Sequence, residues 1–335
     1  MAAGPSDLID GRPHDSTAYL PEGRLQVVND QEILYQLTPV VEQLLERHLE
    51  ASKEWFPHEL VPHGRGRDLE PGHVWSEDDA ELDGHQLTPE VRSALYVNLL
   101  TEDNLPYYFR TVESLFGADG PWGTWVRRWT AEEGRHSMVI YGYLAATQAI
   151  DLVALERGRM AQVSLGETPN PETLHDGFVY LALQELATRI SHRNTGLQMG
   201  DPVGYDVMKR VGSDENLHQL FYRDLAAAAV EVDANEMMMA MERQVRTFAM
   251  PGTGIPDFDA HSRLIAKAGI YDLQIHHEQI LAPVVLRQWD AANISGLSGK
   301  GAAAQEKLMK RMATSERVAK RYAEKRDRER ALQPA

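Results

Sequence analysis

The sequence predicts an all-α fold, in which one helical bundle takes up most of the 335-residue chain. Three observations lead to this prediction. Apolar residues recur every three or four positions over long stretches, as they do on one face of a helix. No segment alternates apolar and polar residues over a useful strand length. A Glu-x-x-His spacing occurs twice, at Glu133–His136 and Glu215–His218, and it places each pair on one helical face.

The N-terminal part of the chain divides into an extension and the start of the bundle. Residues 1–30 are rich in Gly, Pro, Asp and Ser with little periodicity, so we expect a flexible extension there. We expect a helical-bundle domain over residues 31–298 and a basic C-terminal helix or tail over residues 299–335. The first helix should have Asp30 as its N-cap and should kink or restart at Pro39.

The next helices follow from capping residues and proline positions. After a long loop rich in Pro and Gly, Thr88 is expected to cap a helix with Pro89 at its first position. Pro106 should kink this helix or mark its end. The remaining helices are expected at about 120–148, in a short segment ending near 165, and at about 172–199, 202–232, 235–250, 271–289 and 302–330.

Composition excludes several classes of protein. The chain has no cysteine, which excludes disulfides, thiolate metal sites and a cysteine nucleophile. Its formal net charge of −16 argues against nucleic-acid binding. The charge is uneven, because residues 299–335 carry +6 and residues 1–298 carry −22. With no apolar run of membrane-spanning length and no secretory signal pattern, we expect a cytoplasmic protein without membrane insertion.

The two Glu-x-x-His pairs form part of a longer duplicated pattern. Glu102 stands 31 residues before Glu133, and Glu185 stands 30 residues before Glu215, each within an apolar neighbourhood. Four carboxylates and two imidazoles would balance two divalent cations inside a bundle, and they suit iron or manganese. The pattern matches the known two-metal sites of helical bundles, which take a Glu from each of two helices and Glu-x-x-His from two more.

Each of these residues also has a simpler interpretation. A single Glu-x-x-His is usually a solvated pair on a helix surface, and the duplication is what favours metal binding. His192 lies on the same face as Glu185 and is either a ligand or a hydrogen-bonded core histidine. Asp214 either bonds the free ring nitrogen of a ligand histidine or is an exposed charge beside Glu215.

Longer motifs around these residues resemble one known family. "EWFPHELVP", "TEDNLPYY", "RWTAEEGRH", "FVYLALQELATRISHRNT" and "DENLH" occur in this order between about residues 31 and 290. They are similar to the motifs of the soluble desaturases that act on acyl chains bound to acyl carrier protein (ACP), above all the actinobacterial relatives of the stearoyl-type plant enzymes. The resemblance implies a ferritin-like di-iron helical bundle with additional helices.

The resemblance also implies roles for individual residues. Thr188 matches the family's active-site threonine, beside the face where O₂ binds, and Gly177 matches a position that lines the acyl channel. Trp55 and Asp214 match, with His136, a chain proposed for electron entry. Gly134, Leu186 and the "NL" of "DENLH" depart from the family pattern and bear on carrier contacts rather than on the metal. The residues that match the iron ligands are Glu102, Glu133, His136, Glu185, Glu215 and His218.

The implied activity is O₂-dependent desaturation of a fatty acyl chain carried on ACP. It needs two iron ions, ferrous in the reduced form, and O₂ as co-substrate, because unactivated C–H bonds require a strong oxidant. Two external electrons imply a ferredoxin-like donor, and the family implies a homodimer. Because ACP is acidic, it needs a local basic surface, for which Arg127, Arg128, Arg135 and the basic tail are candidates.

Two alternatives remain open at this point. The first is another di-iron or manganese–iron oxidase, such as an N-oxygenase or a ligand-binding oxidase, with the same six ligands and a different cavity. The second is a non-enzymatic metal-binding helical protein, for example one that stores iron.

Overall fold

The computed structural model describes residues 29–331 except 71, 83–84, 170 and 253, and nearly all of its regular structure is helical. The all-α prediction is confirmed. The predicted N-terminal extension falls almost entirely on residues 1–28, which lie outside the described residues. The helices are α1 (Asp30–Ala51), α2 (Pro57–Leu60), η1 (His63–Arg65), η2 (Glu77–Ala80), α3 (Pro89–Asp103), α4 (Leu105–Phe116), α5 (Gly120–Thr147), α6 (Leu152–Leu165), α7 (Leu174–Gln198), α8 (Pro202–Val232), α9 (Ala234–Thr247), α10 (Phe258–Ala268), α11 (Leu273–Ile275), η3 (His276–Gln288) and α12 (Gly299–Ala331).

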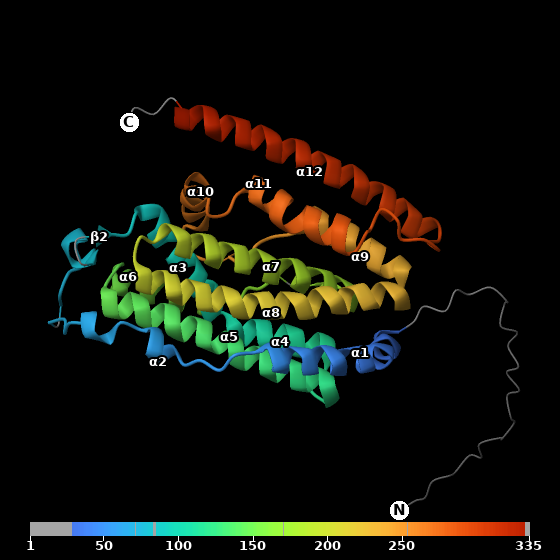
Figure 1. The fold of residues 1–335 in the computed structure, drawn as a ribbon, viewed down its shortest axis with the longest axis horizontal. Coiled ribbons are helices and arrows are strands. Elements are labelled where there is room, and N and C mark those ends of the chain that lie inside the picture. The colour runs from blue at the N-terminus through green and yellow to red at the C-terminus, as the bar shows by residue number, and fades with distance from the viewer. Residues whose placement is uncertain (1–28, 71, 83–84, 170, 253, 332–335) are drawn as a thin grey trace, which may run out of the picture.

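Four long helices form the centre of the bundle. α7 packs extensively along α8, α3 packs on both α5 and α7, and α5 packs on α8, which closes the ring. Figure 1 shows α7 and α8 side by side in the middle of the molecule. The other helices cover this ring: α1 lies on α5 and α8, α4 on α5 and α7, α9 on α7 and α8, and α10 on α3.

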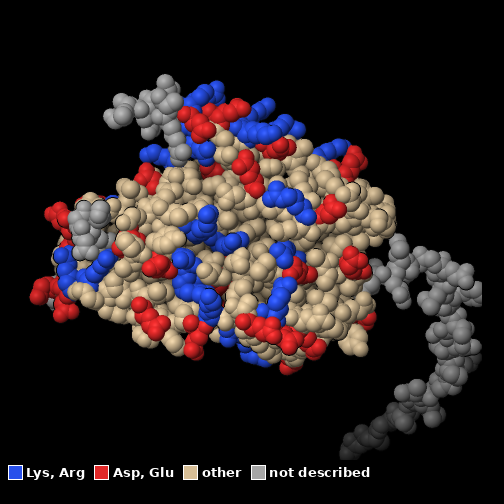
Figure 2. Space-filling view, in the orientation of Figure 1, with Lys and Arg blue, Asp and Glu red and all other residues tan. Residues whose placement is uncertain are grey.

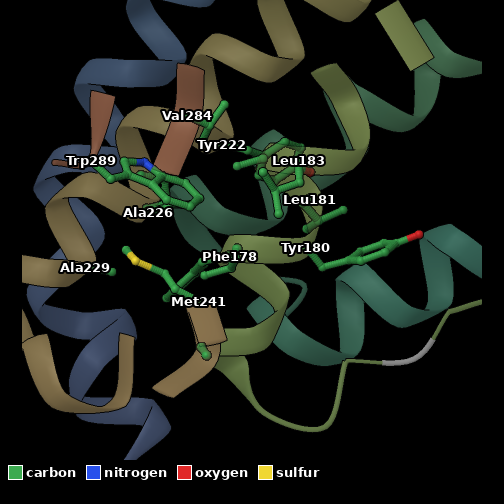
Figure 3. Close-up of a cluster of buried hydrophobic side chains, with 14 of the residues drawn as sticks. Phe178, Tyr180, Leu181, Leu183, Tyr222, Ala226, Ala229, Met241, Val284 and Trp289 are labelled. Atoms are coloured by element: carbon green, nitrogen blue, oxygen red, sulfur yellow. The ribbon is translucent and has the colours of Figure 1, made fainter. Parts of the chain in front are cut away.

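The interior of the bundle has two apolar clusters. One cluster includes Trp125, Phe178 and Phe221, and the other includes Leu95 and Ile140. Figure 3 shows part of the first cluster, where side chains of α7, α8, α9 and η3 meet. Because the two clusters draw on opposite ends of α5 and of α8, the middle of these helices is left for a layer of buried polar side chains.

Helix ends agree in part with the sequence predictions. The Thr88 side chain accepts a hydrogen bond from the Val91 amide and caps α3, as predicted. The N-cap prediction for α1 was wrong by one residue, because Asn29 accepts from the Glu32 amide. Pro39 neither ends nor restarts α1, which continues through it.

Other differences lie in the C-terminal half and in the loop before α3. The sequence predictions missed α10, and the predicted helix at 271–289 is a short α-helical turn followed by the π-helix η3. The loop contains a two-residue hairpin, β1 (Glu81–Leu82) paired antiparallel with β2 (His85–Gln86). These strands are too short for an alternating pattern to reveal them.

The C-terminal helix α12 packs on α9, α11 and η3. Ala304, Leu308 and Met312 are buried on its inner face, and Arg326 pairs with Asp272 at 2.8 Å. Figure 2 shows basic side chains gathered along α12, whereas the rest of the visible face carries both signs of charge. The division of the chain at residue 298 stays a prediction. Within the described part of the chain, no helix is both long and apolar enough to cross a membrane.

Candidate metal centre

The six predicted ligands come together in the polar layer at the middle of the bundle. α3 supplies Glu102, and α7 supplies Glu185. α5 and α8 each supply a Glu and a His one turn apart, so one face of each helix contributes two side chains. All six side chains are buried, with exposed fractions of 6% or less: Glu102, Glu133, His136, Glu185, Glu215 and His218.

These side chains form two overlapping groups, and within each group the candidate ligand atoms lie within 4.8 Å of one another. Glu133 and Glu215 belong to both groups, so each could bridge two neighbouring ions. His136 and His218 point their Nδ1 atoms at these carboxylates, at 3.1 Å and 2.7 Å from Glu133 oxygens. The first group is Glu102, Glu133, His136 and Glu215, and the second is Glu133, Glu185, Glu215 and His218.

The donor atoms fit a pair of divalent cations. The buried atoms that make no hydrogen bond of good geometry within the described residues include Glu133 Oε1, Glu185 Oε2 and His218 Nδ1, although His218 Nδ1 lies only 2.7 Å from Glu133 Oε1. A buried polar atom without a partner is costly, and a bound cation would satisfy all three. Four carboxylates with two imidazoles, and no sulfur ligand, suit iron or manganese.

The buried carboxylates of the site need positive charge beside them, which either bound cations or protons on the side chains can supply. Burial by itself lowers the pKa of His136 and of His218, but Glu133 and the other carboxylates outweigh burial and raise both pKa values well above the usual range. Burial, with Glu215 nearby, raises the pKa of Glu185 well above its usual value. Metal binding would therefore displace protons from this layer and would weaken as the pH falls.

A carboxylate stands behind His136 on the side away from the site. Asp214 Oδ2 lies 3.6 Å from His136 Nε2 and accepts a hydrogen bond from Trp55 Nε1 at 2.8 Å. Arg135 and Arg210 pair with the same carboxylate, and their guanidinium groups lie over the Trp55 ring. The structure thus brings Trp55, Asp214 and His136 into one contiguous row, and Asp214 is buried rather than exposed.

A second carboxylate stands behind His218, and the sequence analysis missed it. Glu132 Oε2 lies 3.0 Å from His218 Nε2 and 2.8 Å from His48 Nε2, and Arg128 pairs with the other oxygen. Burial would raise the pKa of Glu132, but hydrogen bonds from His218 and His48 outweigh it and hold that pKa far below its usual range. One signal could have revealed this pair: His48 occupies an apolar-stripe position in α1, four residues after Leu44.

Thr188 and His192 both contact the carboxylates of the site from α7. The Thr188 hydroxyl lies 2.9 Å from Glu215 Oε2 and also within hydrogen-bonding distance of backbone carbonyls one turn back. His192 Nε2 lies 2.9 Å from Glu102 Oε1, as expected for a hydrogen-bonded core histidine. Trp129 Nε1 donates to Glu185 Oε1 at 3.0 Å.

A narrow apolar cavity of about 40 Å³ reaches the carboxylates from the α4 side. Leu105, Val112 and Leu181 contribute to its wall, and Glu102, Glu133 and Glu215 form its metal-facing end. Gly177 does not line this cavity directly. A β-carbon at Gly177 would lie 2.8 Å from Leu115 Cδ1, and Leu115 does line the cavity.

Comparisons with known proteins agree on one family. A family model described as "Fatty acid desaturase" matches residues 29–334. The Mycobacterium tuberculosis protein named "Putative acyl-[acyl-carrier-protein] desaturase DesA1" is 39% identical over 289 residues, which are 84% of each chain. The chloroplastic "Palmitoyl-[acyl-carrier-protein] 4-desaturase 2" of Ophrys arachnitiformis subsp. archipelagi is 29% identical, over 76% of this chain and 71% of the relative. A solved structure is also similar, the X-ray structure of the "putative acyl-ACP desaturase DesA2 from Mycobacterium tuberculosis H37Rv". It superposes with a TM-score of 0.65 at 25% identity, over 78% of this chain and 96% of that one.

Proposed function

The chain belongs to the acyl-ACP desaturases, a family of oxidoreductases, and from this premise we propose that it uses a carboxylate-bridged di-iron site and O₂ to introduce a cis double bond into an ACP-bound acyl chain. The observation that carries the proposal is the pair of overlapping ligand groups, buried at the end of an apolar cavity. This combination would bring a hydrocarbon chain beside the metal positions. It favours the desaturase over a storage protein or an oxidase with a polar substrate.

The six side chains of the two groups would hold the ions. When bound, the di-iron centre supplies the O₂ activation that breaking unactivated C–H bonds requires. Glu132 would fix the orientation of the His218 imidazole through the hydrogen bond at its Nε2 atom, and Asp214, 3.6 Å from His136 Nε2, would orient the other imidazole electrostatically. The two apolar clusters on either side of the layer would exclude water, which strengthens every electrostatic interaction within it.

Protons and electrons must also reach this buried layer. Removal of two hydrogens from the chain supplies two of the four electrons that reduce O₂ to two waters, so two more electrons and two protons come from outside. Trp55 donates a hydrogen bond to Asp214 and lies beneath the Arg135 guanidinium, a position that suits entry of electrons from a ferredoxin-like donor. Thr188 would hold a proton beside Glu215 at the metal-facing end of the cavity.

Two of the arginines that are candidates for ACP docking contact buried carboxylates while also reaching the surface. Arg128 and Arg135, two candidates for ACP docking, point partly inward and pair with Glu132 and Asp214.

We propose that two copies of the chain pack through the exposed apolar side chains of α5 and α6, because Met138 is 64% exposed and Met160 is 52% exposed. Light scattering should then give the mass of a dimer at micromolar concentration, and a monomer would contradict this. A cytoplasmic location stays a prediction.

Reconstitution tests the proposed function. Protein refilled anaerobically with ferrous iron should bind about two ions per chain, whereas Glu133→Ala should lose both positions because Glu133 belongs to both groups. With O₂, a reduced ferredoxin and saturated acyl-ACPs, mass analysis should then find an unsaturated product. Iron binding below one ion per chain, or no unsaturated product from any acyl-ACP, would refute the proposal.

A further inference from the structure

The narrow cavity beside the metal centre adjoins a much larger surface groove. The groove has a volume of about 1080 Å³ and opens between α4, the loop before α7, and α9. Five residues, which we call the neck, line both spaces: Thr111 and Leu115 of α4, Pro169 and Pro171 of the loop before α7, and Tyr180 of α7. Only the side chains of the neck therefore separate the cavity from the groove on this side.

A third cavity adjoins the first on the other side of the carboxylates. It has a volume of about 50 Å³, and it shares Thr101, Glu102 and Pro251 with the first cavity. Phe258, Ile265 and other apolar side chains make up much of its wall. The three spaces thus follow one another past the metal positions, which lie along a passage rather than at the bottom of a pocket.

The chemical character of the passage changes at the neck. Figure 3 shows the Tyr180 side chain pointing away from the other labelled residues of the apolar cluster. Its hydroxyl is buried, and it has no hydrogen-bond partner among the described residues. Because an unpaired buried hydroxyl is costly, its position at the neck marks the boundary between the apolar cavity and the polar groove.

The groove is polar without a net charge. Its basic residues are Arg110, Arg243 and Arg246, and its acidic residues are Glu167, Glu172 and Asp176. Arg243 is already paired with the buried Asp176 at 3.0 Å. An acidic carrier protein needs a surplus of positive charge, so the groove is not suited to dock the carrier.

We propose that the acyl passage is open at both ends, and that the methyl end of a long acyl chain leaves through the neck and lies in the groove. The substrate class would then include saturated chains longer than the buried passage can hold. This inference rests on the proposed function and deepens it. The protein would set the double-bond position from the carrier side, because chain length on the groove side is not limited by a wall.

The first test measures affinity and turnover as a function of chain length. Iron-loaded protein without reductant is titrated with saturated acyl-ACPs by calorimetry, and kcat/KM is measured separately with reductant and O₂. Each methylene that enters the buried passage should tighten binding by up to about fourfold, equivalent to about 0.8 kcal/mol, until the chain reaches the groove. Beyond that length, affinity and kcat/KM should stay level. A fall of about a hundredfold over two further carbons would show a closed passage and overturn the inference.

Neck variants provide the second test. Thr111→Phe should keep the wild-type affinity for short chains and weaken the longest chains by about tenfold or more, because a ring at this position blocks the neck. Leu115→Trp should do the same and serves as the second variant if Thr111→Phe does not fold. Thr124→Phe, at an exposed position of α5 that lines neither the cavities nor the groove, is the matched control and should leave the length profile unchanged.

The outcomes separate the inference from the proposed function. Neck variants with the wild-type length profile in both affinity and turnover would overturn the inference while leaving desaturation intact. Absence of product at every length would refute the function, and the binding profile would still decide whether the passage is open.

Discussion

Each imidazole of the metal centre is held from behind by a different carboxylate. Asp214 stands behind His136, and Glu132 stands behind His218. Each carboxylate is in turn paired with arginines and with a further ring, Trp55 or His48. Such contacts fix the tautomer and the direction of a ligand histidine, so the two metal positions should depend on them almost as strongly as on the ligands.

Replacing Glu132 should weaken metal binding without removing a ligand. Glu132→Gln loses the charge that His48 and His218 share, and we expect the affinity for ferrous iron to fall roughly tenfold or more. Competition with a chromophoric chelator measures this affinity. Glu46→Gln, on the exposed face of α1, is the control. Equal affinities in the two variants would contradict the role of Glu132.

Replacing Thr188 should separate metal binding from turnover. Thr188→Val keeps the shape of the side chain and removes the hydroxyl that contacts Glu215. We expect near-normal iron content, desaturation slowed by about tenfold or more, and more O₂ consumed per product formed. If the hydroxyl served only its backbone carbonyls, turnover and coupling would remain normal in this variant.

The spacing of residues in the sequence predicted the candidate ligands. It did not predict the contact of Glu132 with His48 and His218. Residues three apart on a helix must share a face, so Glu133 with His136 could be predicted from the sequence alone. Glu132 adjoins Glu133 but points about 100° away around the helix, and only the path of α1 shows what it meets there. His48 lies 84 residues away in the sequence, and no local pattern indicates that separation.

At the scale of helices, the predictions held where a cap or a proline marks an end. α8 begins at Pro202 and ends at Val232, as the pattern indicated, because Asp201 caps its first turn. α10 was missed because it begins without a side-chain cap, after Asp257 in the left-handed conformation. η3 follows a helical pattern in sequence, but the widening of its turns is set by packing around Pro283 and not by local propensity.

Gly134 in the middle of α5 gives a test of helix propensity. A β-carbon there would meet nothing nearer than Leu105 Cδ2 at 3.9 Å, so close packing does not explain this glycine. Gly134→Ala should stabilise the fold by about 0.5–1 kcal/mol, measured by urea unfolding. Gly142→Ala in the same helix is the matched control, because its β-carbon would lie 2.6 Å from Val61 Cγ2 and should stabilise little or destabilise. A loss of stability in Gly134→Ala would show that the glycine is required.

The first turn of η3 contains a histidine that should make stability depend on pH. Burial lowers the pKa of His276 to about 4, with a smaller contribution from His277. Below about pH 6.5, the ordinary pKa of histidine, His276 binds a proton in the unfolded chain but not in the folded chain. The free energy of unfolding therefore decreases as the pH falls. When the pH is lowered from about 7 to about 5, the free energy of unfolding should decrease by about 2 kcal/mol more in the wild-type chain than in His276→Gln. Urea unfolding at both pH values measures this, with the exposed His58→Gln as control, and parallel losses would contradict the prediction.

Across the whole molecule, the metal centre joins helices from both halves of the chain. α3 and α5 meet α7 and α8 through buried carboxylates that repel one another unless protons or cations lie between them. The ring of four helices is therefore expected to be less stable without metal. This property belongs to the assembled bundle and not to any one helix.

Metal removal should lower the melting temperature. With free ferrous iron at about a hundred times its Kd, binding adds about 2.7 kcal/mol, which should raise Tm by roughly 4 °C in a chain of this size. Calorimetry under anaerobic conditions, before and after chelation, measures the change. Glu133→Ala should show little shift, and an equal shift in this variant would place the metal elsewhere.

The division of ligands between the two halves has a consequence for how the protein is made. Neither overlapping group is complete within one half, because Glu215 closes the group that contains Glu102 and His136. A ribosome releases the first three of these ligands well before it reaches the fourth. Until then, the emerging polypeptide offers iron only a partial set of donors. The proposed iron can therefore be fully captured only after about two thirds of the 335-residue chain has been made, because His218 is the last of the candidate ligands, and the order of translation itself delays that capture.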